Sequence, residues 1–198
     1  MADCAQATLR GGEMVVECDD RWNCCQRAQA RAKVNAMNSA ILQHRNATIQ
    51  PPGFSRARGD AWCDSQRRRI DKLDSQGQAD DARASGAPEC LAKQLEGPPA
   101  QTRASLNLAL DHPLDMKLGG PAMPRLMPLD PDVNGAFGSF ARNVGDKRGT
   151  GKKIEKVSLI CPPSGNCPNE DHSTKDAQGQ PPNPIGMFEW TTTYTFTP

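Results

Sequence analysis

The stretch WNCCQRAQARAKVNAMNSAILQH, residues 22–44, decides the fold of the first half of the chain. It holds no proline or glycine and is rich in Ala, Arg, Gln and Lys, which are good helix formers. Its apolar residues mostly recur every three or four positions, at Cys25, Ala28, Ala32, Met37, Ala40 and Ile41. That spacing lines one stripe of a helix. The stretch therefore predicts a long helix with one buried face.

Three shorter helices are expected further along the chain, over residues 60–75, 88–95 and 101–110. Clusters of proline and glycine at 51–53 and 97–99 end the helical units, because these residues interrupt helices. Residues 1–100 therefore read as a helical, cysteine-rich scaffold.

The eight cysteines are an even number in a chain that is poor in core-forming residues, with 36% hydrophobic and 5% aromatic residues. Small domains with weak cores are commonly held together by disulfides. Cys25, Cys63 and Cys90 each fall on an expected helix. Bridges among these three, or to cysteines nearer the N-terminus (Cys4, Cys18 and Cys24), would tie a small helical bundle together.

Two further cysteines, Cys161 and Cys167, flank a loop rich in proline and glycine, and we expect a disulfide between them to clip that loop. The alternative is a zinc site that His172 completes. Two CxxC units, the usual mark of a zinc ribbon, do not occur in the sequence. Disulfides are therefore the preferred reading.

The second half changes character. Strands are expected over residues 125–129, 154–161 and 188–196, and a helix over 132–144. Val133, Phe137, Phe140, Ala141 and Val144 give that helix a clear apolar face. The chain is thus expected to be an α+β protein, with a cysteine-stapled helical N-terminal half packed on a small β-containing C-terminal half. We expect one domain over residues 1–198, with residues 101–198 bearing the functional site.

The candidate site is the stretch DHPLDMKLGG, residues 111–120. It contains His112, one of three histidines in the chain, between Asp111 and Asp115. Histidine titrates near neutral pH, and a nearby carboxylate can orient it or share a hard cation with it. A helical turn after Pro113 would pair His112 with Asp115. An extended chain would put the two aspartates on one side and His112 on the other, with Asn134 as its expected partner.

This stretch, together with PLD at 128–130 and VNGAFG at 133–138, resembles the HxxD DNase toxin family. These are C-terminal domains of bacterial polymorphic toxins, often delivered by type VI secretion. The resemblance is best over residues 105–145 and weaker over 1–100. It makes His112 and Asp115 the histidine and aspartate of the motif.

The resemblance implies an antibacterial nuclease toxin for interbacterial competition, which cleaves DNA phosphodiesters with a divalent metal, Mg²⁺ in the first place. Asp115 is the expected metal ligand, with Asp111 and Asn134 behind it. The implied partners are a DNA substrate, a cognate immunity protein and a secretion-system carrier. The toxin would be secreted and would act in the cytoplasm of the target bacterium.

A second resemblance competes with the first. Asp111-His112, a Gly-Gly turn, a strand and then a helix that opens with Asn134 is similar to an HNH-like His-metal finger nuclease. The chain lacks that pattern's asparagine before the second strand, where Pro124-Arg125 stands, and its second helix histidine. Both readings make His112 the general base, and they differ over whether Asp111 or Asp115 is the key acid.

The net charge of +1 excludes a global field that attracts nucleic acid. Phosphate contacts must then come from local basic residues, and we expect them at Lys117, Arg142, Lys147, Arg148, Lys152 and Lys153. No membrane span is expected, and the first 16 residues lack the pattern of a Sec signal peptide. Two other functions stay open: a peptidoglycan-directed or other hydrolytic effector, and a non-catalytic, disulfide-stabilised interaction module.

Overall fold

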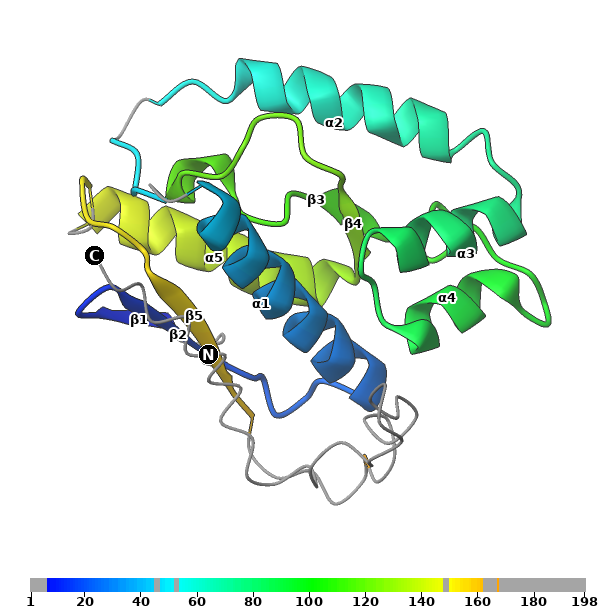
Figure 1. The fold of residues 1–198 in the computed structure, drawn as a ribbon. Helices are drawn as coiled ribbons and strands as arrows, with labels where there is room; N and C mark the ends of the chain where they lie inside the picture. Colours follow the sequence, from blue (N-terminus) through cyan, green and yellow to red (C-terminus); the bar gives the residue numbers. More distant parts are fainter. Residues whose placement is uncertain (1–6, 45–46, 52–53, 148–149, 162–166, 168–198) are drawn as a thin grey trace.

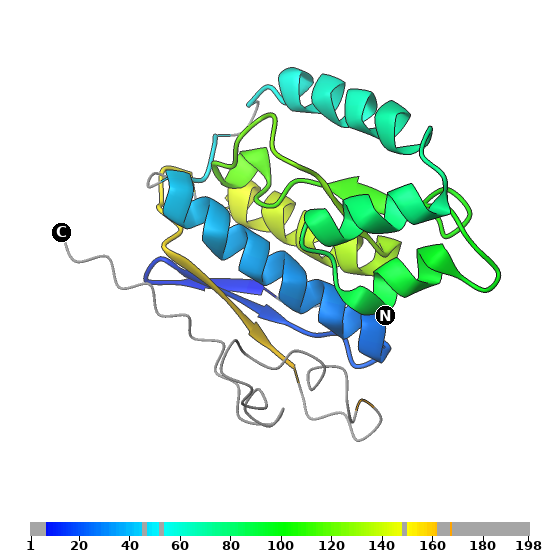
Figure 2. The same ribbon diagram turned by 45° about the vertical axis from the view of Figure 1, so that its right-hand side comes forward.

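The computed structural model describes residues 7–44, 47–51, 54–147, 150–161 and 167. The protein has an α+β fold arranged around one long helix, α1 (Cys24–His44), as expected for residues 22–44. A three-stranded sheet lies on one side of α1, and helix α5 (Pro131–Lys147) lies on another (Figures 1 and 2). The expected strand at 188–196 lies outside the described residues.

The three-stranded sheet joins the two ends of the described chain. Strands β1 (Ala7–Arg10) and β2 (Glu13–Glu17) form an antiparallel hairpin, and β5 (Lys156–Ile160) runs parallel to β2. The hairpin contradicts the expectation that the first hundred residues are helical. Gly11 and Gly12 both adopt positive φ values, 53° and 88°, and a two-residue turn of this kind suits a tight hairpin. Met14 and Val16 then alternate into the core.

A buried amide covers the outer edge of β5. The Asn38 side chain on α1 donates to the Val157 carbonyl at 2.9 Å and accepts from the Val157 N–H at 2.8 Å. Asn38 therefore pairs with this strand as a neighbouring strand would. This contact satisfies the backbone of Val157 and fixes α1 against the sheet.

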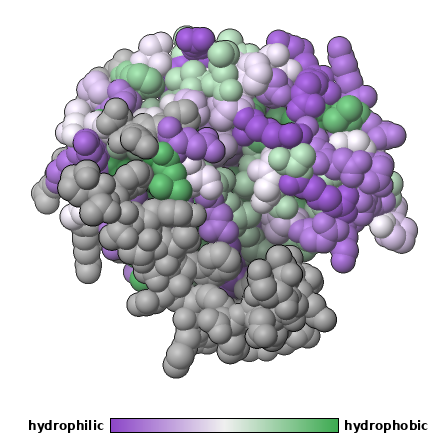
Figure 3. Space-filling model, viewed as in Figure 1, coloured by the Kyte–Doolittle hydropathy of each residue, from purple (hydrophilic) through white to green (hydrophobic). Residues whose placement is uncertain are grey.

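Three helices follow α1. They are α2 (Ala57–Ile70), α3 (Ser75–Ala84) and α4 (Glu89–Glu96). The expected helix at 88–95 is confirmed as α4, and that at 60–75 is confirmed as far as Ile70, where α2 ends in a turn. Helix α3 was not expected. It begins where the Asp74 side chain accepts a hydrogen bond from the Gly77 N–H at 2.8 Å. Figure 3 shows hydrophilic side chains gathered over the side of the molecule that α3 and α4 form in Figure 1.

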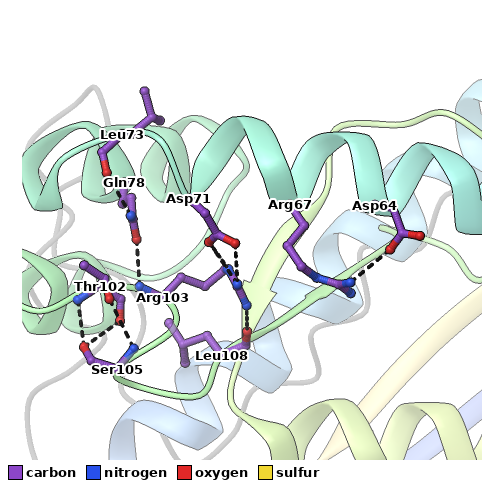
Figure 4. Close-up of polar contacts among 9 residues, drawn as sticks. All are labelled: Asp64, Arg67, Asp71, Leu73, Gln78, Thr102, Arg103, Ser105 and Leu108. Atoms are coloured by element: carbon purple, nitrogen blue, oxygen red, sulfur yellow. Dashed lines mark hydrogen bonds and ion pairs between the residues drawn. The ribbon is translucent and has the colours of Figure 1, made fainter.

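The prediction of a helix over residues 101–110 is wrong. The segment forms turns and then strand β3 (Ala109–Asp111). Thr102 and Ser105 satisfy each other's backbone N–H groups through their hydroxyls, and such local bonds compete with a helix. Asn107 then takes a positive φ of 54°. Arg103 ties the segment to Asp71 at the end of α2 and to the Leu108 carbonyl (Figure 4).

The second half follows the expected order. Strand β4 (Met127–Leu129) pairs antiparallel with β3, and a short 3-10 helix, η1 (Met116–Leu118), lies between them in sequence. In α5, Val133, Phe137 and Ala141 are buried, as their spacing predicts. One continuous core links α1, α3, α4 and α5 to both sheets. No helix in the described part is both long enough and apolar enough to cross a bilayer.

Three disulfides connect the described part of the chain, namely Cys18–Cys161, Cys24–Cys167 and Cys25–Cys90. The bridge between α1 and α4 is one of those expected for the helical half. The expected Cys161–Cys167 clip is wrong, because the parallel pairing of β2 with β5 brings Cys18 beside Cys161. The zinc alternative fails with it, since both thiols are oxidised. Cys63 is the one free cysteine among the described residues.

The contribution of the Cys25–Cys90 disulfide to stability can be measured by unfolding. The variant Cys25→Ser/Cys90→Ser should lose about 2–4 kcal/mol of unfolding free energy, because a 65-residue separation is no longer closed in the unfolded chain. Urea unfolding measures this loss. Cys63→Ser is the matched control, as it removes a thiol that closes no bridge, and should cost about 1 kcal/mol or less. Equal losses in the two variants would contradict the stapling role.

Candidate functional site

His112 follows β3 and is enclosed by the fold, with 3% of its surface exposed. Its ring lies against α2. The Cys63 Sγ atom is 3.7 Å from Nδ1 and 4.0 Å from Nε2. One turn earlier in α2, a Cβ atom added to Gly59 would lie 3.4 Å from Nε2 and 2.0 Å from Met116 Sδ. Glycine at this position therefore leaves room for the Met116 side chain against α2, whereas the distance to the imidazole is an ordinary van der Waals contact.

A buried lysine holds the backbone at His112. Lys33, on α1, is 2% exposed. Its Nζ donates to Asp111 Oδ2 at 2.6 Å and also to the His112 carbonyl. The other Asp111 oxygen accepts from the His112 N–H at 2.9 Å. Lys33 thus binds the carbonyl of His112, and Asp111 binds its N–H.

Asp115 lies at the start of η1. Its Oδ1 accepts from the Lys117 N–H at 2.7 Å, and its Oδ2 pairs with the Arg56 guanidinium at 3.2 Å. The glycines after η1 are needed for this geometry. Gly119 has a positive φ of 88°, and a Cβ on Gly120 would lie 1.9 Å from the Leu114 carbonyl oxygen. The Gly-Gly pair therefore folds the loop back tightly behind Asp115.

Asp111 and Asp115 line one small cavity together with Lys33, and Phe137 and Gly138 of α5 close its far side. The His112 ring faces α2 instead. The aspartates and the histidine thus face different sides, as in the extended alternative, but the chain itself is not extended, because Met116–Leu118 forms a 3-10 helix and the ring contacts Cys63 and not Asn134. The cavity measures about 10 Å³, which is about the smallest space that holds one water.

Burial shifts the pKa values of the His112 imidazole and of the Cys63 thiol. It lowers the pKa of His112, and the nearby Lys33 ammonium adds to this effect. The Asp111 and Asp115 carboxylates and a hydrogen bond with the Ala122 backbone oppose it in part. The imidazole is therefore neutral at neutral pH, the form that accepts a proton. Burial raises the pKa of the Cys63 thiol, with Asp111 next in effect, so Cys63 is not an activated nucleophile.

The structure brings His112, Asp111 and Asp115 together, but the other expected residues lie elsewhere. Asn134 is on α5, one turn before Gly138, and its side chain makes no hydrogen bond with a described residue. Lys117 follows Asp115 and is half-buried. The remaining basic residues lie after or near the end of α5. Lys152 and Lys153 are exposed, whereas Arg148 and the side chains of Arg142 and Lys147 lie outside the described part.

Sequence reasoning missed Lys33 and Arg56, the two cations that pair with the aspartates. The importance of Lys33 could have been inferred from the sequence, because it lies among the apolar residues Ala30, Val34 and Met37 on the buried face of α1. A lysine at such a position needs a buried partner. No sequence pattern indicated the role of Arg56, because its pairing with Asp115 spans 59 residues of sequence.

The donor set at the cavity has the chemistry of a hard-cation site in part. Two carboxylates face one space, and carboxylate oxygens are the ligands that Mg²⁺ prefers. Among the described residues, however, no group of three His, Cys, Asp or Glu side chains converges as metal ligands. Both carboxylates are also paired with protein cations. An ion that binds here must displace at least one of them.

No family model, no curated protein and no solved structure matches the chain.

The low pKa of His112 predicts how stability depends on pH. The unfolded chain takes up the proton near the ordinary pKa of 6.5, but the folded chain resists it. The stabilising contribution is therefore complete above that value and is lost as the pH falls below it. Urea unfolding of the wild type should show decreasing stability between about pH 7.5 and pH 5. His112→Asn should reduce that slope, and an unchanged slope would contradict a buried neutral imidazole.

Proposed function

We propose that the chain is a DNA-cleaving effector in which His112 is the general base and Asp115 is the key acid. One observation carries the proposal: a neutral, buried imidazole follows a carboxylate that a lysine holds in place, and a second carboxylate shares the same cavity. A base, a cation site and positive charge near the phosphate are what phosphodiester hydrolysis requires.

The residues divide the chemistry among them. Neutral His112 takes a proton from the attacking water at a ring nitrogen, and Asp111 with Lys33 keeps the imidazole in place. A divalent cation, if bound at Asp115 and Asp111, would stabilise negative charge on the phosphate. Arg56, once released from Asp115, can place its guanidinium on a phosphate oxygen, a geometry that arginine favours.

The biological setting of the proposal rests on other features. Disulfides form in oxidising surroundings, and the three bridges suit a protein that passes through such surroundings during export. Together with the resemblance to the HxxD toxins, they support a toxin that a secretion-system carrier, such as a type VI machine, delivers into a target bacterium. DNA would be the substrate there, and an immunity protein would protect the producing cell.

A second candidate function is a non-catalytic, disulfide-stabilised interaction module. The burial of His112 favours it, because a histidine with 3% exposure cannot touch a substrate in this conformation. In that reading Lys33, Asp111 and His112 form a structural network. Cleavage activity distinguishes the two functions directly.

The nuclease proposal predicts that the purified chain nicks plasmid DNA with Mg²⁺ and that EDTA stops it. His112→Ala should lower the rate at least about a hundredfold, the usual loss when a general base is removed. Agarose gels of plasmid conversion measure the rate. Lys72→Ala is the matched control, because Lys72 is exposed on the turn after α2. An intact plasmid with folded wild-type protein would favour the interaction module.

The two acids should behave differently. Asp115→Asn should abolish Mg²⁺-dependent cleavage with little loss of stability, since its partner Arg56 is part-exposed. Asp111→Asn leaves Lys33 buried without its carboxylate and should cost about 3–5 kcal/mol as well. Cleavage assays paired with urea unfolding separate these effects. A silent Asp115→Asn beside an inactive, folded Asp111→Asn would replace the HxxD reading with the HNH-like one.

A further inference from the structure

A pair of arginines lies between α2 and α3, held by one buried carboxylate. Asp81, on α3, is 7% exposed, and its Oδ1 atom accepts from Arg69 Nη2 at 2.9 Å and from Arg125 Nη2 at 3.1 Å. The two arginine side chains are 47% and 53% exposed. Because two guanidinium charges share one carboxylate charge, the pair carries a surplus positive charge at the surface.

The fold fixes both arginines in this position. Trp62, on α2, donates from its indole N–H to the Pro124 carbonyl at 2.8 Å, and this bond holds the residue before Arg125 against the helix. Arg69 follows Trp62 by two turns on the same flank of α2, and its Nε donates to Gln66 Oε1 at 2.9 Å. The guanidinium groups are thus in place before a ligand arrives, which reduces the entropy lost on binding.

Much of the hydrogen-bonding capacity of the pair is unused. A guanidinium has five N–H donors. Within the described part of the chain, the Nη1 groups of Arg69 and Arg125 make no hydrogen bond. The two like charges repel each other, and an anion bound to both would offset that repulsion. The pair can therefore accept an anionic group on its exposed side.

Further cations extend this pair into a basic row along α2, which is the outermost helix in Figures 1 and 2. Two exposed arginines of α2 have no ion-pair partner among the described residues, namely Arg58 and Arg68. With Arg69 they span about three turns of the helix. Two nearby acids are already matched, since Asp64 pairs with Arg67 and Asp71 with Arg103 (Figure 4). Asp60 lies on the opposite flank of α2 from Arg58.

We propose that Arg69 and Arg125 bind the phosphate backbone of DNA and that the basic row along α2 follows the strand. Arginine contacts a phosphate through parallel N–H···O bonds, and the pair offers such donors side by side. A DNA strand carries a continuous line of negative charge, which matches a row of cations better than the separate carboxylates of an acidic protein. This inference rests on the proposed function, because it names where that substrate is held.

Anisotropy of a fluorescent DNA duplex, measured in EDTA to prevent cleavage, tests the pair. Arg69→Gln and Arg125→Gln should each weaken binding about tenfold, the effect of one lost hydrogen bond between charged groups. Each should also make the slope of log affinity against log salt concentration less steep by about one. Asp81 keeps one arginine in either variant, so urea unfolding should change little. A folded wild type that binds no DNA would overturn the site.

Arg67→Gln is the matched control. It removes the same charge from the same helix, but Arg67 pairs with Asp64 at 3.0 Å (Figure 4). Arg67 lies two residues before Arg69 and therefore on the opposite flank of α2. Its DNA affinity and salt slope should stay close to those of the wild type. Equal losses in Arg67→Gln, Arg69→Gln and Arg125→Gln would mean that only net charge matters, and the arginine pair would not be a site.

Polyglutamate is the competitor that separates DNA from an acidic protein as the partner. It should displace the duplex poorly, whereas displacement as effective as that by unlabelled DNA would contradict the assignment to a phosphate backbone. The site and the proposed function fail separately. Weaker binding in both arginine variants, beside a plasmid that the wild type leaves intact, defeats cleavage alone. Cleavage by the wild type with unchanged affinity in both variants defeats the arginine site alone.

Discussion

The buried ion pair between Lys33 and Asp111 is the interaction on which the candidate site depends. A lysine at 2% exposure is costly unless its charge is matched, and here the ammonium meets one carboxylate and the His112 carbonyl. Lys33 belongs to α1, which also carries Asn38 on β5 and the bridge to α4. The position of His112 therefore depends on the central helix as well as on its own segment, where Asp111 accepts from the His112 N–H.

The site is electrostatically complete in the closed state. Each aspartate has a cation, Lys33 for one and Arg56 for the other, and the imidazole is kept neutral by burial. Of these two pairs, the one at Asp115 is the more exposed, because the Arg56 side chain is 43% exposed and the Lys33 side chain 2%. The disulfides fix α1, α4 and the sheet, and Cys63 of α2 belongs to none of them.

Local sequence patterns predict the elements that have strong periodicity or strong breakers. The apolar spacing of residues 22–44 and of Val133, Phe137 and Ala141 gives α1 and α5 nearly as they occur. The hairpin of β1 and β2 is missed because its strands are short, and the turn at Thr102 and Ser105 because hydroxyl bonds override a helical composition. The motif predicts that His112 and its aspartates lie together. The buried position of Lys33 on α1 indicates that it needs a partner, but the sequence does not identify the partner of Lys33 or of Arg56, since pairings over 78 and 59 residues arise only from the fold.

A double-mutant cycle on the Lys33–Asp111 pair tests the central claim most directly. Lys33→Met and Asp111→Asn should each lower the unfolding free energy by about 3–5 kcal/mol, because each leaves one buried charged or polar partner unmatched. The double variant should lose far less than the sum of the two, since neither charge then remains alone. Urea unfolding of the four proteins at neutral pH gives the coupling. Additive losses would mean that the two side chains do not act as one pair, and the account of how His112 is held would be wrong.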